Sequence, residues 1–331
     1  MEMGISNQTV VLLDLAKVVD ILSFCLSSII FIVLIYLIIS YSPAHFGNYT
    51  YLLMVFSMNS WIFALAHAFL QPVISVEKYV LFVFSPTNYM QFSKTTIRAL
   101  LAIYGISYSQ TIVFIAVQFI YRYLAICHRS YLYLFDRKFL VFWYLLIVVF
   151  GFNWGFCIFY IAKETPETDA IIGPVLENSF GLKIENVNYV AANYYMSNGV
   201  DLNLKTIFMV VNFAIIIGSS LVVITICCIK IWNKFGTIKN SQDSQDLLVT
   251  ALTFQMIIPL FLLYVPILVV LALPVFKIQN EAIVSFTSII ISLYPLFDAT
   301  TMIAIIPYYR NGFVKLMTPS KVSNQIENLD F

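Results

Sequence analysis

Long blocks of apolar residues alternate along this chain with short stretches that hold nearly all of its charges. A block of roughly 20 uncharged apolar residues is long enough to cross a bilayer as a helix. Backbone groups in hydrocarbon must find partners within their own segment, so we expect each block to be helical. The pattern predicts seven spans, at about 18–39 and 49–71 and within 98–122, 138–163, 205–230, 246–277 and 281–310.

The composition agrees with an integral membrane protein. Of the 331 residues, 61% are hydrophobic and 11% are charged, and the mean hydropathy is +0.89. About a quarter of the residues of a soluble domain are charged, and a soluble core does not bury this much apolar surface. We therefore expect an all-α membrane protein built as a seven-transmembrane helix bundle. The predicted regions are an N-terminal tail at 1–17, the bundle at 18–309 and a short tail at 310–331.

The charges of the loops orient the predicted bundle. An odd number of spans puts the two chain ends on opposite faces, and the face of the C-terminal tail holds ten basic residues against eight on the other. This excess predicts a cytosolic C-terminus and an N-terminus outside. The glycosylation sequons at Asn7 and Asn48 fall on opposite faces, so only Asn7 is expected to be glycosylated. In the tail, the i, i+3, i+4 spacing of Phe313, Leu316 and Met317 fits a short helix along the inner membrane surface.

Motifs of catalysis are missing from the sequence. It has three histidines and no HExxH, no phosphate-binding glycine loop and no Gly-x-Ser-x-Gly turn. The formal net charge is +1 and the basic residues are scattered, which does not favour nucleic-acid binding. The five cysteines lie within or at the ends of spans, without a zinc-ligand spacing or a disulfide framework. We expect no enzymatic activity, no metal and no cofactor.

Two ionisable residues stand out within or at the ends of the spans. Arg122 closes the third span, about 36 Å along the helix from Arg98, and so reaches the inner interface. It is either an anchor that snorkels to the interface or a charged latch for a cytoplasmic partner. Asp298 lies about 18 Å from Arg310, where a carboxylate must be paired, hydrated or protonated. It is either a structural polar group, meeting Asn59 of the second helix, or part of a switch.

The sixth span contains two prolines, Pro259 and Pro266, seven residues apart. Each proline removes a backbone hydrogen bond and bends the helix, and a spacing of about two turns puts both kinks on one face. Prolines are common in membrane helices. Together these two form a candidate hinge by which the inner half of the sixth helix swings away from the third.

Aromatic and small polar side chains gather in the outer half of the predicted bundle. Tyr104, Tyr108 and Thr111 are spaced i, i+4, i+7 and so share one helix face. Such residues are either core and interfacial belt or the lining of a pocket for a small, mostly apolar ligand with one or two hydrogen-bonding groups. The aromatic end of the acidic outer loop, within 163–204, is a candidate cover for this pocket. The candidate ligand-binding residues are Tyr104, Ser107, Tyr108, Thr111, Phe208, Asn212 and Tyr264.

Four separated motifs, in order, resemble the nematode serpentine chemoreceptors of the Str group, which are seven-helix G-protein-coupled receptors. FIYRYLAIC at 119–127 is similar to the Phe-x-Tyr-Arg-Tyr signature of that family, and the segment 46–52 is similar to its first inner loop. SQDSQDLLVTALTFQMIIP at 241–259, followed by Pro266, resembles its entry into helix six. YPLFDATTMIAIIPYYR at 294–310 resembles its Tyr-Pro-x-x-Asp-Pro and closing Tyr-Arg.

The resemblance implies a receptor of rhodopsin-like architecture with its N-terminus outside. Such receptors bind a small odorant or another environmental ligand and activate a heterotrimeric G protein, in the plasma membrane and cilium of a sensory neuron. Arg122 then takes the place of the arginine presented to the G protein, with Tyr121 where related receptors have an acid. The residues implied in coupling and switching are Tyr121, Arg122, Tyr123, Lys234, Lys239, Pro259, Pro266, Asp298, Tyr309 and Arg310.

The chain also departs from the pattern of such receptors. Ala299 replaces the proline expected after Asp298, and Tyr264 stands where rhodopsin-like receptors commonly have tryptophan. No cysteine is placed to bridge the third helix to the long outer loop. An alternative function is a subunit of an odorant-gated cation channel with inverted topology, and a transporter is a third. Membrane lipid is an expected partner, and assembly with itself or with another chain stays open.

Overall fold

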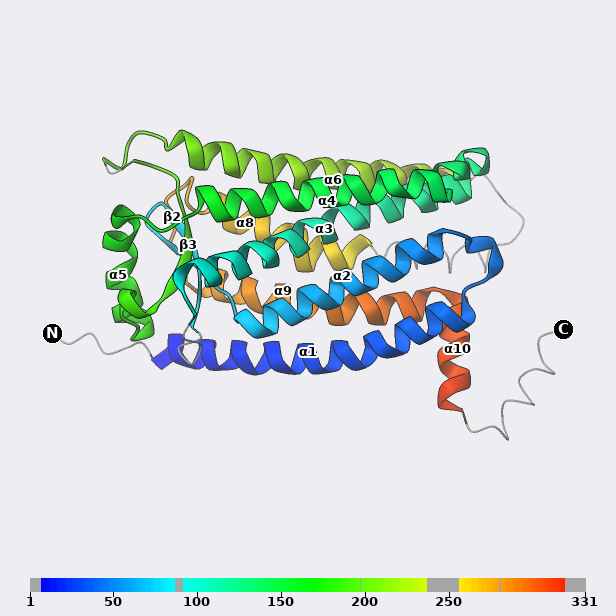
Figure 1. The fold of residues 1–331 in the computed structure, drawn as a ribbon, viewed down its shortest axis with the longest axis horizontal. Helices are drawn as coiled ribbons and strands as arrows, with labels where there is room; N and C mark the ends of the chain where they lie inside the picture. The colour runs from blue at the N-terminus through cyan, green and yellow to red at the C-terminus, as the bar shows by residue number, and fades with distance from the viewer. Residues whose placement is uncertain (1–6, 87–91, 197, 237–255, 280, 319–331) are drawn as a thin grey trace.

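The apolar blocks lie side by side as an elongated helical bundle in the computed structural model (Figure 1). The model describes residues 7–86, 92–196, 198–236, 256–279 and 281–318. The long helices are α1 (Asn7–Tyr41), α2 (Tyr49–Leu70), α3 (Lys94–Cys127), α4 (Arg137–Phe156), α6 (Leu204–Gly236) and α9 (Glu281–Ile305). The sixth span is described over Met256–Ala272 and includes α8 (Val265–Ala272). Within the described part of the chain, six helices long enough to span a membrane and this shorter apolar one confirm the predicted seven-helix bundle.

The helix α3 runs through the centre of the bundle and contacts α2, α4 and α6 (Figure 1). Its residues from Thr111 to Phe119 are all buried, so protein surrounds this part of the helix on every side. Two glycines bring α4 close to α3: a Cβ at Gly155 would lie 2.5 Å from Ile106 Cγ1, and one at Gly151 2.7 Å from Gln110 Cγ. Small residues at such contacts allow membrane helices to pack closely.

A three-stranded antiparallel sheet covers one end of the bundle, beside the start of α1 (Figure 1). It consists of β1 (Val73–Glu77), β2 (Val80–Ser85) and β3 (Asn188–Asn193), with β2 in the middle. The helix α5 (Pro166–Phe180) packs on the sheet, and its first turn begins with a capping box between Thr165 and Thr168. The first part of the aromatic loop end predicted as a cover forms β3. The hairpin of β1 and β2 was not predicted.

Successive residues of the strands point to opposite faces of this sheet. Phe82, Phe84 and Tyr189 pack with Ile172 and Leu176 of α5 in a small separate core. Their neighbours Leu81, Val83, Val190 and Ala192 instead face the bundle, where they line a cavity. Because both faces are apolar, the strands lack the alternation of a half-exposed sheet.

A polar contact also ties β3 to α5. The Tyr189 hydroxyl donates to Asp169 Oδ1 over 2.5 Å and lies 2.8 Å from Thr168 Oγ1. Burial raises the pKa of Tyr189, and the Asp169 carboxylate acts in the same direction, so the hydroxyl stays protonated and remains a donor. The five cysteines are free in the structure, so packing and hydrogen bonds hold this cover in place. We call the sheet and α5 the lid.

Several element boundaries differ from the predicted ones. The helix α1 begins at Asn7, so residues 7–17 of the predicted tail are helical. The first predicted span was started after the charges near residue 17, but these charged residues belong to α1. Asp14 and Lys17 pair along its surface at 3.5 Å, and Asp20 points into the bundle. At the other end, the predicted short helix exists as α10 (Pro307–Met317), which begins before residue 310 and lies across the bundle (Figure 1).

Candidate functional site

A cavity of about 120 Å³ lies between the sheet and the helices α3, α4, α6, α8 and α9. Its walls are almost entirely apolar, and they include Trp154, Met209, Phe213, Ile267, Leu271 and Ile291. Of the candidate ligand-binding residues, Tyr104 and Tyr108 line it, as their shared helix face predicts. The cavity therefore includes two of the seven candidate residues, and its lining is more apolar than expected.

Three of the other candidates, Ser107, Thr111 and Asn212, contact neighbouring helices rather than this cavity. Asn59 Nδ2 donates to Thr111 Oγ1 over 2.9 Å and to the Ser107 carbonyl over 3.2 Å, so these residues join α3 to α2. Asn212 accepts a hydrogen bond from Asn153 of α4 over 2.7 Å. Phe208 does not line this cavity, because its side chain is 64% exposed on the outer face of α6.

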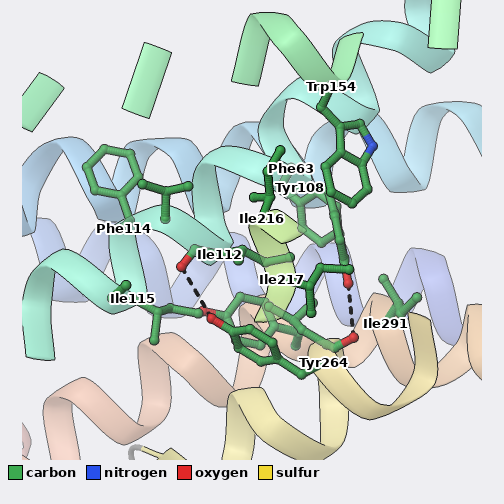
Figure 2. Close-up of a cluster of buried hydrophobic side chains, with 14 of the residues drawn as sticks. Phe63, Tyr108, Ile112, Phe114, Ile115, Trp154, Ile216, Ile217, Tyr264 and Ile291 are labelled. Atoms are coloured by element: carbon green, nitrogen blue, oxygen red, sulfur yellow. Dashed lines mark hydrogen bonds between the residues drawn. The ribbon is translucent and has the colours of Figure 1, made fainter. Parts of the chain in front are cut away.

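Tyr264 lies deeper than the cavity and joins three helices. Its hydroxyl is 2.7 Å from Ser220 Oγ on α6. It is also 3.3 Å from the carbonyl oxygen of Ile112 on α3, a contact drawn in Figure 2. The residue is 1% exposed and belongs to a π-helical segment, Leu260–Tyr264. Tyr264 thus joins the sixth span to α6 and α3 and does not line the cavity.

The cavity is linked directly to this π-helical segment. The hydroxyl of Tyr108, which lines the cavity, donates to the carbonyl oxygen of Leu263 over 2.9 Å (Figure 2). The segment follows Pro259, and Pro266 comes shortly after it, so the two predicted kink positions flank an irregular stretch. Both prolines are buried. Prolines and π-bulges are common causes of helix kinks, so the backbone agrees with a hinge here.

Trp154 of α4 was missed as a cavity residue. Its indole stacks on Phe213 of α6 with ring centroids 3.8 Å apart, and it is tilted against Tyr108 at 5.7 Å (Figure 2). A tryptophan buried in a helix span is a visible signal in the sequence, but an apolar span does not show which of its faces meets the bundle and which meets lipid.

A buried ionisable pair lies behind the cavity wall and was also missed. His67 Nε2 of α2 is 3.4 Å from Asp20 Oδ1 of α1, and the two side chains are 3% and 7% exposed. The other ring nitrogen, Nδ1, is 3.0 Å from the Tyr104 hydroxyl. An aspartate inside an apolar run was the available signal, because charges in membrane spans need partners. Its partner on α2 is not apparent from sequence spacing.

Arg122 lies near the opposite end of the bundle, one and a half turns before α3 ends. Its guanidinium lies over the Phe119 ring, 5.3 Å from the centroid, in the geometry of a cation–π contact. Arg122 and Asp298 line the same small cavity, of about 20 Å³, together with Gln118 and Pro259. The two ionisable residues singled out by the sequence thus meet beside the inner proline of the sixth span.

The partner predicted for Asp298 is corrected by the structure. Ser60 Oγ, not Asn59, approaches it from α2 and donates to Asp298 Oδ2 over 3.4 Å. Asn59 faces α3 instead. One position along a helix turns a side chain by about 100°, so neighbouring residues point to different helices. Asp298 was predicted to point into the bundle, and its contact with Ser60 of α2 agrees with this prediction.

The remaining residues implied in coupling surround the same end. Tyr121 stacks on Tyr49 of α2, with centroids 3.6 Å apart and planes at 3°, and Tyr123 lies edge-on to His128 at 5.4 Å. Lys234 is exposed at the end of α6, and Arg310 is half-buried in α10. Lys239 lies outside the described residues.

The helix α10 is fixed to this end by Tyr309. The Tyr309 hydroxyl is 2.8 Å from Ser42 Oγ, and the residue is fully buried. A Cβ at Gly312 would lie 2.8 Å from the Tyr41 ring, so glycine permits the close approach of α10 to α1. Burial raises the pKa of Tyr309 to about 12. The two sequons lie at opposite ends of the bundle, with Asn7 starting α1 at the lid end and Asn48 just before α2.

Comparison with known proteins agrees with this architecture. The family model described as "Serpentine type 7TM GPCR chemoreceptor Str" matches residues 16–314. The chain belongs to this family. Among its relatives, serpentine receptor class r-10 of Caenorhabditis elegans is 29% identical over 95% of this chain and 93% of its own length. The G-protein coupled receptor str-33 of the same organism is 25% identical over 96% and 95%.

Membership in the Str family confirms the resemblance on which the expected roles depend. The family model spans the lid, the cavity, Arg122 and the start of α10, so it covers each part of the site. As a member of this family, the chain is a multi-pass membrane receptor of the G-protein-coupled class. The roles of individual side chains in ligand binding and coupling remain predictions.

Proposed function

We propose that this receptor binds a small, mostly apolar odorant in the cavity under the lid and activates a heterotrimeric G protein at the α10 end. The observation that carries the proposal is the hydrogen bond from Tyr108 to Leu263. One residue both lines the cavity and contacts the irregular part of the sixth span. A ligand that displaces the Tyr108 ring therefore acts directly on the hinge, because no other residue lies between Tyr108 and the π-helical segment.

The space around the sixth span favours a movement of its inner half. A second cavity, of about 200 Å³, lies between α3, α6 and this half, and Pro259 and Tyr264 border it. Well-packed cores have few voids larger than a water molecule. A helix with unfilled space beside it and prolines within it has fewer contacts to break when it moves.

The proposed active state separates the sixth span from Arg122. Pro259 and Asp298 line the small cavity of Arg122, so a shift of the span at Pro259 opens that cavity and frees the guanidinium. The ligand favours this state only by the difference between its affinities for the two states. Arg122, with Lys234 and Arg310 at the same end of the bundle, then receives the G protein, and Lys239 of the sequence is proposed to take part. On this proposal the lid end lies outside the cell, and the receptor resides in the plasma membrane and cilium of a sensory neuron.

Exchange of Arg122 for alanine tests the coupling role. The receptor and a G protein are reconstituted in nanodiscs, and ligand-stimulated nucleotide exchange on the G protein is measured. Arg122→Ala is expected to reach the cell surface and to lose stimulated exchange. Arg129→Ala is the matched control, because Arg129 is an exposed arginine just past the end of α3. Undiminished exchange in the Arg122 variant contradicts the proposal.

The orientation is tested separately by glycosylation. Asn7→Gln is expected to remove a glycan from the expressed receptor, and Asn48→Gln is expected to change nothing. The reverse result would place the lid end in the cytosol. That topology, with a ligand-gated current in cells that lack G proteins, supports the channel alternative instead.

A further inference from the structure

The irregular stretch of the sixth span has a cavity on each side of it along the bundle. Toward the lid, the Leu263 carbonyl accepts a hydrogen bond from Tyr108, which lines the cavity under the lid. Toward the α10 end, Leu260 and Tyr264 border the cavity of about 200 Å³, which we call the inner cavity. The proposed function uses the first of these cavities as the ligand site. It gives the inner cavity no occupant.

The inner cavity extends from α3 to the outer surface of the bundle. Its deep wall includes Ile115 of α3, which is buried, and its α6 wall includes Ile224, which is buried as well. Ile229 of α6 also lines the cavity, yet it is 54% exposed. A lining side chain that is half exposed marks an opening on the outside of the bundle, and this part of α6 belongs to an apolar membrane span. The inner cavity therefore opens toward lipid, and its occupant comes from the bilayer.

The lining of the inner cavity favours uncharged apolar molecules. Its described lining residues include no charged side chain, and most of them are aliphatic or aromatic. The Tyr264 hydroxyl already has a partner in Ser220. A charged group would lose its hydration here without gaining a partner, so ions are excluded. An apolar cavity of about 150 Å³ holds benzene, so the inner cavity, at about 200 Å³, fits a single small ring.

We propose that the inner cavity is a second binding site, which takes small uncharged apolar molecules from the bilayer and thereby holds the sixth span in its present position. Side chains around a cavity lack van der Waals contacts that an apolar occupant supplies. Pro259, Leu260 and Tyr264 form one wall, so a swing of the inner half of the span withdraws this wall from the occupant. A ligand favours the state for which its affinity is higher. The occupant therefore opposes the hinge movement, and the site itself does not depend on a ligand under the lid.

Isotope-labelled isoleucine methyl groups report on the two cavities separately. Ile115 and Ile224 line the inner cavity, whereas Ile267 and Ile291 line the cavity under the lid. The labelled receptor is placed in lipid nanodiscs without a G protein, and benzene is titrated while the methyl resonances are followed by NMR. The ring current of a bound benzene shifts the resonances of methyl groups beside it. Ile226 is the matched control, because it is exposed on the lipid-facing side of α6.

Benzene is expected to occupy a defined site in the wild-type receptor. Ile115 and Ile224 are expected to shift to a plateau, while Ile226 only follows the amount of benzene dissolved in the lipid. Benzoate has the same ring with a charge, and it is expected to bind roughly tenfold or more weakly. Hydrogen exchange of the Leu260–Tyr264 amides is expected to slow when benzene is bound, because the occupant favours the present position of the span.

A ring placed in the cavity by substitution tests the location of the site. Cys228 lines the inner cavity, so the phenyl ring of Cys228→Phe fills much of it, and benzene is expected to bind roughly tenfold or more weakly there. Val222→Phe is the matched control, since it adds a ring on the exposed face of α6 and is expected to keep the plateau at Ile115. If Cys228→Phe does not fold, the contrast between Ile115 and Ile226 in the wild-type receptor still tests the proposal.

The proposal is overturned if Ile115 and Ile224 follow Ile226 without a plateau, if benzoate binds as tightly as benzene, or if Cys228→Phe leaves the plateau unchanged. Nuclear Overhauser contacts from lipid chains to Ile115, without a benzene-dependent shift, would assign the cavity to an acyl chain and overturn it as well. Faster exchange of Leu260–Tyr264 with benzene contradicts the effect on the sixth span.

None of these measurements involves signalling, so the two proposals can fail separately. A receptor that binds benzene beside Ile115 but activates no G protein contradicts the proposed function alone. A receptor that activates a G protein but shows no plateau at Ile115 contradicts this inference alone.

Discussion

The hydroxyl groups of Tyr264 and Ser220 lie 2.7 Å apart and join the sixth span to α6 in the middle of the bundle. Ser220 also donates to the Ile112 carbonyl over 3.0 Å, so the contact includes α3. Tyr264 is the last residue of the π-helical segment that Tyr108 touches. The place of this pair between cavity and inner end makes it the contact that a moving sixth span must break.

Tyr264→Phe is expected to raise ligand-independent signalling. The change keeps the ring and removes the hydrogen bond that Tyr264 donates to Ser220, so the inactive arrangement loses about 1 kcal/mol relative to the active one. Basal nucleotide exchange on the reconstituted G protein measures the shift, and Ser220→Ala is expected to act in the same direction. The exposed Ser219→Ala, on the same helix, is the control. Unchanged basal exchange in Tyr264→Phe contradicts a locking role.

The span pattern and the inward face of α3 are predictable from sequence for a simple physical reason. Charges are excluded from hydrocarbon, so they mark the spans, and i, i+4 spacing puts Tyr104 and Tyr108 on one face whatever surrounds the helix. Pro259 and Pro266 are equally visible, because the missing backbone hydrogen bond belongs to the residue itself.

The rotation of each helix is much harder to predict. Lipid tails are as apolar as a protein core, so Phe208 on the lipid side and Phe213 in the cavity wall look alike in sequence. Strands β1 and β2 are apolar on both faces, so in sequence they look like another apolar block rather than like strands. The pairing of Asp20 with His67 depends on how α1 and α2 turn toward each other, which spacing within one helix does not reveal.

The contrast between two phenylalanines of α6 tests the position of the cavity. Phe213→Ala enlarges the cavity by most of a ring, so the receptor is expected to bind larger apolar ligands more tightly and its original ligand less tightly. Phe208→Ala removes the same atoms from the exposed face and is expected to leave both affinities unchanged. Affinities for a homologous series of ligands measure the effect. Equal effects of the two variants contradict this cavity as the ligand site.

The lid is predicted to fold as a unit on its own small core. Phe82 and Leu176 are both fully buried between sheet and α5, and truncating a buried phenylalanine costs about 3–5 kcal/mol. Phe82→Ala is therefore expected to speed hydrogen exchange throughout the strands and α5 while α3 stays protected. Hydrogen exchange read by mass spectrometry distinguishes these segments. Asn178→Ala, on the exposed side of α5, is the control, and protection that survives Phe82→Ala contradicts the role of this core.

Docking of α10 is predicted to fail at high pH. Burial raises the pKa of Tyr309 to about 12, above the value of about 10 expected in an unfolded chain. Because the folded state favours the protonated hydroxyl, its stabilisation is fully present below pH 10 and is lost as the pH rises toward 12. A fluorophore on an exposed residue of α10 reports the undocking. Tyr309→Phe removes the titrating group and the bond to Ser42, so it is expected to dock more weakly at neutral pH and to lack the alkaline transition. An alkaline transition that persists unchanged in Tyr309→Phe assigns it to another group and contradicts the prediction.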